Sequence, residues 1–312
     1  RPETKNGDPR IWIYNLKTYA SPGDLLAIII KEQQLLIINC SKSNLERLLD
    51  IKSKFYKDFL NNLVFINSEV ADELKAKIEN IYKRGFINTL RVGDTGVGYT
   101  LETLLKISAN SSKQPDYKGI EIKSARLRSK KNGRTTIFSQ VPNWEISNLK
   151  SSKAILFKRG KFNSEKNRYQ LFHEFVTTKI NSYNMRLELD ESFEYLHQIY
   201  IKDKLYEKDV KWEINKLKKR LIEKHKETFW VTAQTKGKNG DRDEMFRYIS
   251  LKHTGNIDPN AFPILLNDGV ISLDYTIKEK KGGGAKDQGY LFKIANKNLD
   301  LLFSSVKEYT FN

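Results

Sequence analysis

Residues 115–123, PDYKGIEIK, place a turn directly before a short apolar strand that carries charged side chains. Successive side chains of a β-strand point to opposite faces. Ile120 and Ile122 therefore share the face that can anchor the strand in a core. Glu121 and Lys123 share the other face. The stretch predicts a strand with one apolar and one polar side, and the rest of the domain is expected to pack around it.

The polar side has the residue types of a metal site that hydrolyses phosphodiesters. Asp116 lies in the turn and can reach the same side as Glu121. Two carboxylates suit Mg²⁺, which prefers oxygen ligands and keeps several waters. The ion makes a bound water more acidic, and Lys123 can orient that water and stabilise the phosphate in the transition state. The alternative is an ordinary solvent-exposed Glu–Lys charge pair on a strand.

The charge of the chain indicates a polyanionic partner. Its 312 residues include 55 Lys and Arg against 38 Asp and Glu, a net charge of +17. Such an excess favours nucleic acid, because phosphate contacts release counterions. A lysine-rich surface kept for solubility is the alternative. Between residues 118 and 134 the only acid is Glu121. The seven bases of that segment are Lys118, Lys123, Arg126, Arg128, Lys130, Lys131 and Arg134.

Other features exclude several classes of protein. No apolar run reaches the length of about 18 residues that a membrane span needs. The single cysteine, Cys40, excludes an internal disulfide and favours an intracellular, cytoplasmic location. The N-terminus has neither a signal-peptide core nor an initiator methionine, which indicates a fragment. The glycine-rich run 93–98 lacks the Gly-Lys-Ser/Thr ending of a phosphate loop, so no nucleotide cofactor is expected.

Hydrophobic periodicity predicts a mixed α/β chain in two parts. Residues 1–86 are expected to form an accessory region, or the tail of a further DNA-binding domain, with strands at 11–16, 24–30 and 34–39 and helices at 44–60 and 68–83. Residues 87–312 are expected to form the catalytic domain. Its predicted helices lie at 101–107, capped by Thr100, at 169–180, and at 209–224, where a solvated basic face is expected. Its predicted strands lie at 119–123, 134–141, 228–235, 244–251, 269–277 and 289–294.

Three runs carry a resemblance to a known family: GDTGVGYTLETLLKI (93–107), NSSKQPDYKGIEIKSAR (110–126) and TTIFSQVPNW (135–144). In this order they resemble the MvaI/BcnI family of type II restriction endonucleases, which is similar in fold to the mismatch-repair nicking enzyme MutH. The resemblance begins near Gly93 and extends to the C-terminus. It implies a MutH-like fold, with a central mixed sheet flanked by helices and a DNA cleft between two lobes, in a prokaryotic intracellular enzyme.

The resemblance also implies the active-site residues. It makes Asp116, Glu121 and Lys123 the catalytic set of a PD-(D/E)xK nuclease, with Mg²⁺ held by the two carboxylates. Glu102 is similar to a helix glutamate that related enzymes place beside the metal; the alternative is a solvent-facing helix residue. The family implies a monomer that recognises a short site in double-stranded DNA and cuts the strands one after the other. A strand-nicking repair enzyme and a catalytically inert DNA-binding module are the alternatives.

Residues that contact DNA are also suggested. The resemblance suggests that the C-terminal segment GGGAKDQGYLFKI (282–294) reads bases, with Asp287 accepting from cytosine and Lys293 donating to guanine. Gln288 stands where the family commonly has histidine, and glutamine suits adenine, so the recognised sequence is left open. Arg126 and Arg128 are expected to clamp phosphates, with base reading as their alternative. Lys130, Lys131 and Arg134 are expected to contact the DNA backbone.

Overall fold

The structure is a computed structural model that describes residues 12–31, 34–43, 68–107, 115–127 and 133–311. The chain forms two compact units, Arg1–Ile66 and Asn67–Asn312. The division lies before helix α4 (Ser68–Lys83), whereas the sequence predicts it after residue 86. α4 belongs to the second unit because its apolar side, including the fully buried Leu74, packs into the core of that unit.

The described part of the first unit is a β-hairpin and one helical turn. Strands β1 (Leu26–Lys31) and β2 (Gln34–Asn39) pair antiparallel, which confirms two predicted strands. The prediction of a strand at 11–16 is wrong, because residues 12–15 lead through a turn into a helix. Asn15 has a left-handed backbone (φ 55°) that turns the chain into helix α1 (Leu16–Tyr19). The predicted helix 44–60 lies outside the described residues.

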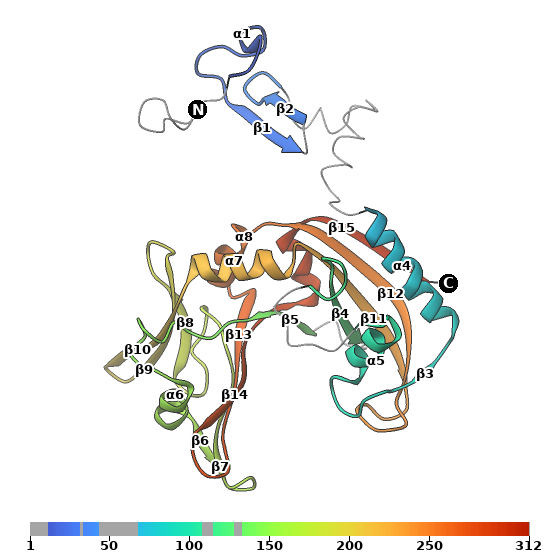
Figure 1. The fold of residues 1–312 in the computed structure, drawn as a ribbon. Helices are drawn as coiled ribbons and strands as arrows, with labels where there is room; N and C mark the ends of the chain where they lie inside the picture. The colour runs from blue at the N-terminus through green and yellow to red at the C-terminus, as the bar shows by residue number, and fades with distance from the viewer. Residues whose placement is uncertain (1–11, 32–33, 44–67, 108–114, 128–132, 312) are drawn as a thin grey trace. The chain divides into compact units, whose positions relative to one another are not determined.

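The first sheet of the second unit is mixed and curved (Figure 1). Its strand order is β15 (Phe303–Thr310), β12 (Met245–Ile257), β11 (Glu227–Lys236) and β4 (Glu121–Arg126), and the short β3 (Ile87–Asn88) also pairs with β12. β4 runs parallel to β11, and the other pairs are antiparallel. Helices α4 and α5 (Gly96–Leu104) share a hydrophobic core with this sheet. This architecture confirms the predicted mixed α/β fold with helices flanking a central sheet.

A second, antiparallel sheet forms the other half of the unit. Its order is β5 (Arg134–Ser139), β14 (Ala285–Ala295), β13 (Ile271–Glu279), β7 (Arg168–Phe175) and β6 (Lys161–Asn163). A third sheet contains β10 (Leu205–Glu213), β9 (Tyr195–Lys202) and β8 (Met185–Leu189). The remaining helices are α6 (Ser152–Arg159), α7 (Ile214–Lys224), α8 (Ala261–Asn267) and the 3₁₀ helix η1 (Asn296–Leu302). One core joins these elements around Trp212, Tyr275 and Tyr290.

The segment 169–180 is not the predicted helix, because most of it forms strand β7. Leu171 and Phe175 are four residues apart, a spacing that falls on one face of a helix and also on one face of a strand. Pairing with β13 and β6, which the segment alone does not reveal, decides for the strand. The other predicted strands are confirmed as β4, β5, β11, β12, β13 and β14, with small differences at their ends.

Two helices start elsewhere than predicted. α7 begins at Ile214, because residues 209–213 still belong to strand β10. α5 begins at Gly96, so Thr100 lies inside the helix and is not its cap. The buried Thr100 hydroxyl accepts a hydrogen bond from the Leu90 N–H at 3.0 Å, which ties down the loop before the helix. In the described ranges no helix is long and apolar enough to cross a membrane.

Replacing Leu74 by alanine tests whether α4 is part of the second unit. Leu74 is fully buried, and a buried Leu→Ala change costs about 2–5 kcal/mol. We expect Leu74→Ala to lower the free energy of unfolding by that amount in a urea titration. Asn80→Ala, on the exposed side of the same helix, is expected to change it by less than about 0.5 kcal/mol. Equal effects of the two substitutions would contradict the placement of α4.

Candidate active site

A tight turn over residues 117–120 folds Asp116 back against β4. The ends of the turn exchange two backbone hydrogen bonds, of 2.9 and 2.8 Å, around Lys118 and Gly119, whose φ angles are 44° and 94°. These left-handed conformations are those of a two-residue hairpin turn, which glycine adopts readily. Asp116 Oδ2 accepts a hydrogen bond from the Ile122 N–H at 3.0 Å. The turn therefore fixes the Asp116 carboxylate beside the strand.

Strand β4 has the two sides that alternation predicts. Ile120 and Ile122 are buried in the core that β4 forms with α4 and α5. Lys123 is on the other side and lines a cavity. Glu121 is 0% exposed. It is therefore not one half of a solvent-exposed charge pair, the alternative that the sequence left open.

Two lysines neutralise the buried Glu121 carboxylate. Lys123 Nζ lies 2.7 Å from Oε1, and Lys224 Nζ, at the end of α7, lies 2.7 Å from Oε2. Both oxygens are buried, and neither lysine meets them with the geometry of a hydrogen bond. A buried carboxylate costs several kcal/mol unless cations compensate it, and these two ammonium groups offset that cost for Glu121.

Lys224 is a site residue that the sequence analysis missed. The sequence predicts a solvated basic face for its helix. Leu217, Leu221 and Lys224 follow one another at spacings of four and three, which places them on one side of a helix. Both leucines are fully buried. This spacing could have shown that Lys224 faces inward, because a solvated lysine would lie on the side of the helix opposite to the buried leucines.

Helix α5 brings a further carboxylate to this place. Burial raises the pKa of Glu102, the negative charge of Asp116 raises it further, and Lys123 acts in the opposite direction. Glu102 interacts with both charges because α5 packs beside β4. Glu102, Asp116, Glu121 and Lys123 thus form one cluster, which distinguishes Glu102 from an ordinary solvated helix residue.

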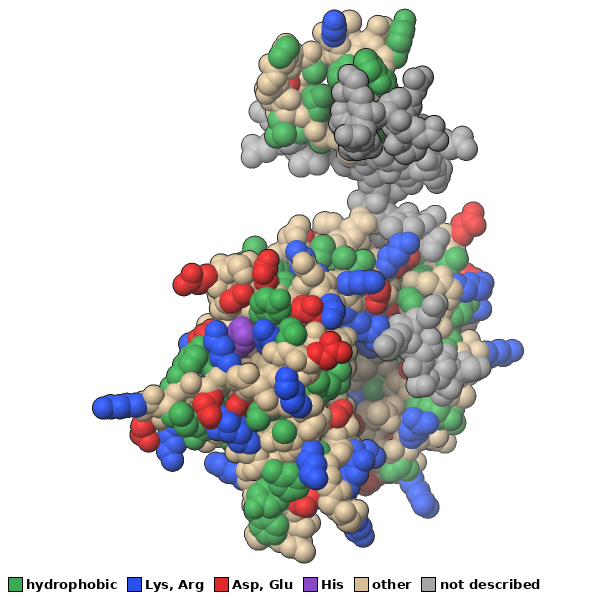
Figure 2. Space-filling view, turned by 60° about the vertical axis from the view of Figure 1, so that its left-hand side comes forward, with side chains coloured by type: hydrophobic (Ala, Val, Ile, Leu, Met, Phe, Trp, Pro, Cys, Tyr) green, Lys and Arg blue, Asp and Glu red, His purple; other side chains and the backbone are tan. Residues whose placement is uncertain are grey.

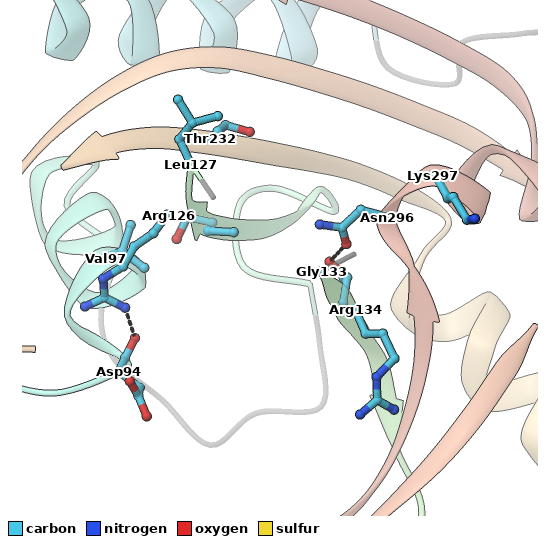
Figure 3. Close-up of a pocket in the computed structure, with 12 residues that line it drawn as sticks. Asp94, Val97, Arg126, Leu127, Gly133, Arg134, Thr232, Asn296 and Lys297 are labelled. Carbon is cyan, nitrogen blue, oxygen red and sulfur yellow. Dashed lines mark hydrogen bonds between the residues drawn. The ribbon is translucent and has the colours of Figure 1, made fainter. Parts of the chain in front are cut away.

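A cavity of about 650 Å³ adjoins the cluster. Val97 of α5 and Arg126 of β4 line one side, and Arg134 of β5 and Asn296 of η1 line the other (Figure 3). A neighbouring cavity of about 430 Å³ is lined in part by the same residues and also by Lys123. Together they form one cleft between the first and second sheets, with Lys123 in its wall.

Arg126 is engaged within the protein. Its guanidinium pairs with both carboxylate oxygens of the fully buried Glu244, at 2.6 and 2.7 Å. It also donates to the carbonyls of Asp94 (2.8 Å) and Gly93 (3.1 Å), as Figure 3 shows for Asp94. Four of its five N–H donors are used in this way. The contacts hold the start of α5 against β4 and leave little capacity for a phosphate or a base, the two roles that the sequence left open.

Two predicted DNA-contacting residues converge on one acid of the second sheet. Arg134 Nη1 lies 2.8 Å from Asp274 Oδ1, and Lys293 Nζ lies 2.7 Å from Asp274 Oδ2. Arg134 also pairs with Glu174 at 2.9 Å. Because Arg134 lines both parts of the cleft, this network lies at the cleft wall.

The remaining predicted contacts are less connected to the cluster. Asp287 and Gln288 are exposed on β14, and Asp287 accepts a hydrogen bond from the Ser152 hydroxyl at 3.0 Å. Neither residue lines the cleft. Arg128, Lys130 and Lys131 lie outside the described residues. Lysine and arginine side chains are spread over the visible face of the second unit rather than gathered in one strip (Figure 2).

The carboxylates suit a hard cation that brings its own ligands. Glu121 has two buried oxygens without hydrogen-bond donors, and the N–H of the next residue, Ile122, holds the Asp116 carboxylate. Within the described ranges, no three His, Cys, Asp or Glu side chains form a group that could hold a metal ion. This donor set fits Mg²⁺, which uses one or two carboxylates together with waters and substrate phosphates. It does not fit a closed zinc site.

Comparisons with known proteins give consistent results. The sequence model of the MvaI/BcnI restriction endonuclease family matches residues 75–303. A solved structure described as a restriction endonuclease MvaI–cognate DNA substrate complex is similar in fold, with a TM-score of 0.66 and 23% identity over 78% of this chain and 99% of that chain. A structure of restriction endonuclease MvaI in the absence of DNA is 25% identical over 77% of this chain and 98% of that chain, with a TM-score of 0.45. No curated protein sequence matches the chain.

The raised pKa of Glu102 predicts a pH-dependent gain in stability for Glu102→Gln. The fold favours the protonated carboxyl group, so the ionised form destabilises the protein at pH 8. We expect the amide to raise the free energy of unfolding there by less than about 1 kcal/mol, since solvent screens a half-buried group. The gain should shrink as the pH falls through the raised pKa and become negligible below the ordinary value of 4.5, where the Glu102 carboxyl is protonated in the folded and the unfolded chain alike.

Urea titrations at pH 8 and pH 4 measure this effect. Glu69→Gln, at an exposed position of α4, is the control and should show no comparable gain. A loss of stability in Glu102→Gln at pH 8 would contradict the prediction.

The Arg126 contacts predict a loss of stability rather than of phosphate binding. Arg126→Gln leaves Glu244 buried without its partner, which should cost about 3–5 kcal/mol. The double variant Arg126→Gln/Glu244→Gln is expected to recover part of this loss. The slope of log Kd for DNA against log salt should not change in either variant. A decrease of about one unit in that slope would instead show a phosphate contact.

Proposed function

The chain belongs to the MvaI/BcnI restriction endonuclease family, and on this basis we propose that it is a type II site-specific endonuclease that hydrolyses phosphodiester bonds of duplex DNA. One observation carries the proposal. Glu102, Asp116 and the ion pair of Glu121 with Lys123 form a cluster beside a cleft between two sheets. A net charge of +17 favours a polyanion as the occupant of that cleft.

Asp116 and Glu121 are the residues that would hold Mg²⁺. When bound, the ion supplies a more acidic water and polarises the scissile phosphate. Asp116 is suited to this role because the turn fixes it, and Glu121 because burial restricts the positions of its carboxylate. These restraints lower the entropy that is lost when the carboxylates bind a cation.

Lys123 and Glu102 would act on the water and the phosphate. Lys123 is 33% exposed and lines the cleft, so its ammonium group can reach an oxygen of bound DNA while its stem stays on β4. A fixed positive charge at this position stabilises the negative charge that develops on the phosphate. Glu102 would assist by accepting a hydrogen bond from a water in the cluster.

Recognition is assigned to the second sheet. Lys293 would donate to guanine, and Asp287 would accept from cytosine. Gln288 would contact adenine or guanine through its side-chain amide. Arg134 would contact the backbone, as would Arg128, Lys130 and Lys131 in the connection from β4 to β5. The MvaI protein of the similar structure binds a cognate DNA substrate, which supports duplex DNA as the partner of this chain. We propose that it acts as a monomer and cuts the strands in sequence.

Cleavage of unmethylated genomic DNA with Mg²⁺, followed by sequencing of all new ends, tests the proposal. We expect ends that share a short motif. Glu121→Ala and Lys123→Ala should each lower the rate by more than about 10³-fold, because each removes a group that stabilises the transition state, while specific binding persists. Lys166→Ala, an exposed lysine in the turn between β6 and β7, is the control and should cleave normally.

The other outcomes separate the alternatives. New ends in one strand only would favour a nicking enzyme. Site-specific binding without any cleavage would favour an inert DNA-binding module. Cleavage that persists in Glu121→Ala would refute the assigned active site.

A further inference from the structure

The Glu121 carboxylate has more positive charge around it than one catalytic lysine provides. Lys123 and Lys224 each place an ammonium group 2.7 Å from a different oxygen of Glu121. Lys123 comes from the same strand as Glu121, and its side chain is 33% exposed at the cleft. Lys224 comes from α7, and its side chain is only 15% exposed. The second lysine is therefore an inward-facing group and not a surface residue that happens to be near.

The position of Lys224 is fixed by its neighbour. His225 follows it as the C-cap of α7 and is fully buried. The imidazole Nδ1 lies 2.9 Å from the Thr228 hydroxyl, and its ring stacks on Trp230 with centroids 5.3 Å apart. Burial lowers the pKa of His225 to about 3, so the ring is neutral and adds no charge.

The residue that anchors the end of α7 on the first sheet lies next to Glu121. Thr228 is the residue of β11 that lies opposite Glu121 in the parallel pairing of β11 with β4. His225 also contacts the Ile137 carbonyl of β5, in the second sheet. The end of α7 is thus held to both sheets, and Lys224 is directed at the one carboxylate oxygen that Lys123 does not contact.

A divalent cation on Glu121 would bring positive charge next to both lysines. Lys123 can move toward the phosphate, because it lines the cleft. No contact with the phosphate is assigned to Lys224, so it would stay beside the cation. Like charges in a poorly solvated site repel one another strongly. We propose that Lys224 competes with the divalent cation for Glu121 and so weakens binding of the ion to the protein without DNA. The ion then binds well only when a DNA phosphate adds negative charge to the site.

This inference rests on the proposed function, since it uses the same carboxylate as the metal ligand. It assigns Lys224 a regulatory role that catalysis by Lys123 does not require. It also gives a reason for the fixed geometry: a competitor that is held in place acts on every encounter with the ion, whereas a mobile lysine would move aside.

Binding of Mn²⁺ to the full chain without DNA, followed by the electron paramagnetic resonance signal of the free ion, tests the competition. We expect Lys224→Gln to bind Mn²⁺ about tenfold more tightly than the wild type, because it removes one nearby positive charge. Lys224→Arg keeps the charge and should bind as weakly as the wild type. Lys219→Gln is the matched control, since Lys219 is 78% exposed on the same helix; it should leave the affinity unchanged.

Glu121→Gln separates the two ideas. If it does not weaken Mn²⁺ binding, the metal site of the proposed function is wrong and the competition falls with it. If Glu121→Gln loses the ion but Lys224→Gln binds it no more tightly than the wild type, the proposed site stands and the competition is overturned. Tighter Mn²⁺ binding in Lys224→Arg would also overturn the competition. This measurement can be made even if Lys224→Gln does not fold.

Discussion

The site is built around a carboxylate that the fold removes from water. Glu121 is 0% exposed, and an ionised carboxylate is tolerated there only with compensating charge. The compensation comes from Lys123 on the same strand and from Lys224 at the end of a helix packed against another sheet. This requirement links two distant parts of the chain, so a single acidic side chain constrains how α7 meets β4.

Strand β4 serves two purposes along its length. Its first half carries Glu121 and Lys123, and its last residue, Arg126, binds Glu244 and the carbonyls before α5. The arginine therefore holds the helix that brings Glu102 to the cluster. Because Glu121, Lys123 and Arg126 lie on one strand, the spacing between these three residues is set by covalent geometry rather than by loop conformation.

The charged groups near the cleft are already paired with one another. Arg134 and Lys293 share Asp274, and Arg126 is engaged with Glu244. A polyanion that enters the cleft must offer Arg134 and Lys293 contacts at least as favourable as those to Asp274. A ligand without matching groups would leave Arg134 and Lys293 without the partner they have in Asp274, which disfavours wrong partners.

The sequence by itself determined that a strand carries Glu121 and Lys123, that this strand has an apolar and a polar side, and that its residue types suit a cation, because alternation and donor chemistry are local properties. Tertiary structure alone decided that Glu121 is buried against Lys224, that Arg126 is engaged by an acid 118 positions away, and that most of 169–180 belongs to a strand instead of a helix. These outcomes depend on which segments meet in space. Periodicity within one segment carries no information about its partners, so burial and long-range ion pairs appear only when the chain has folded.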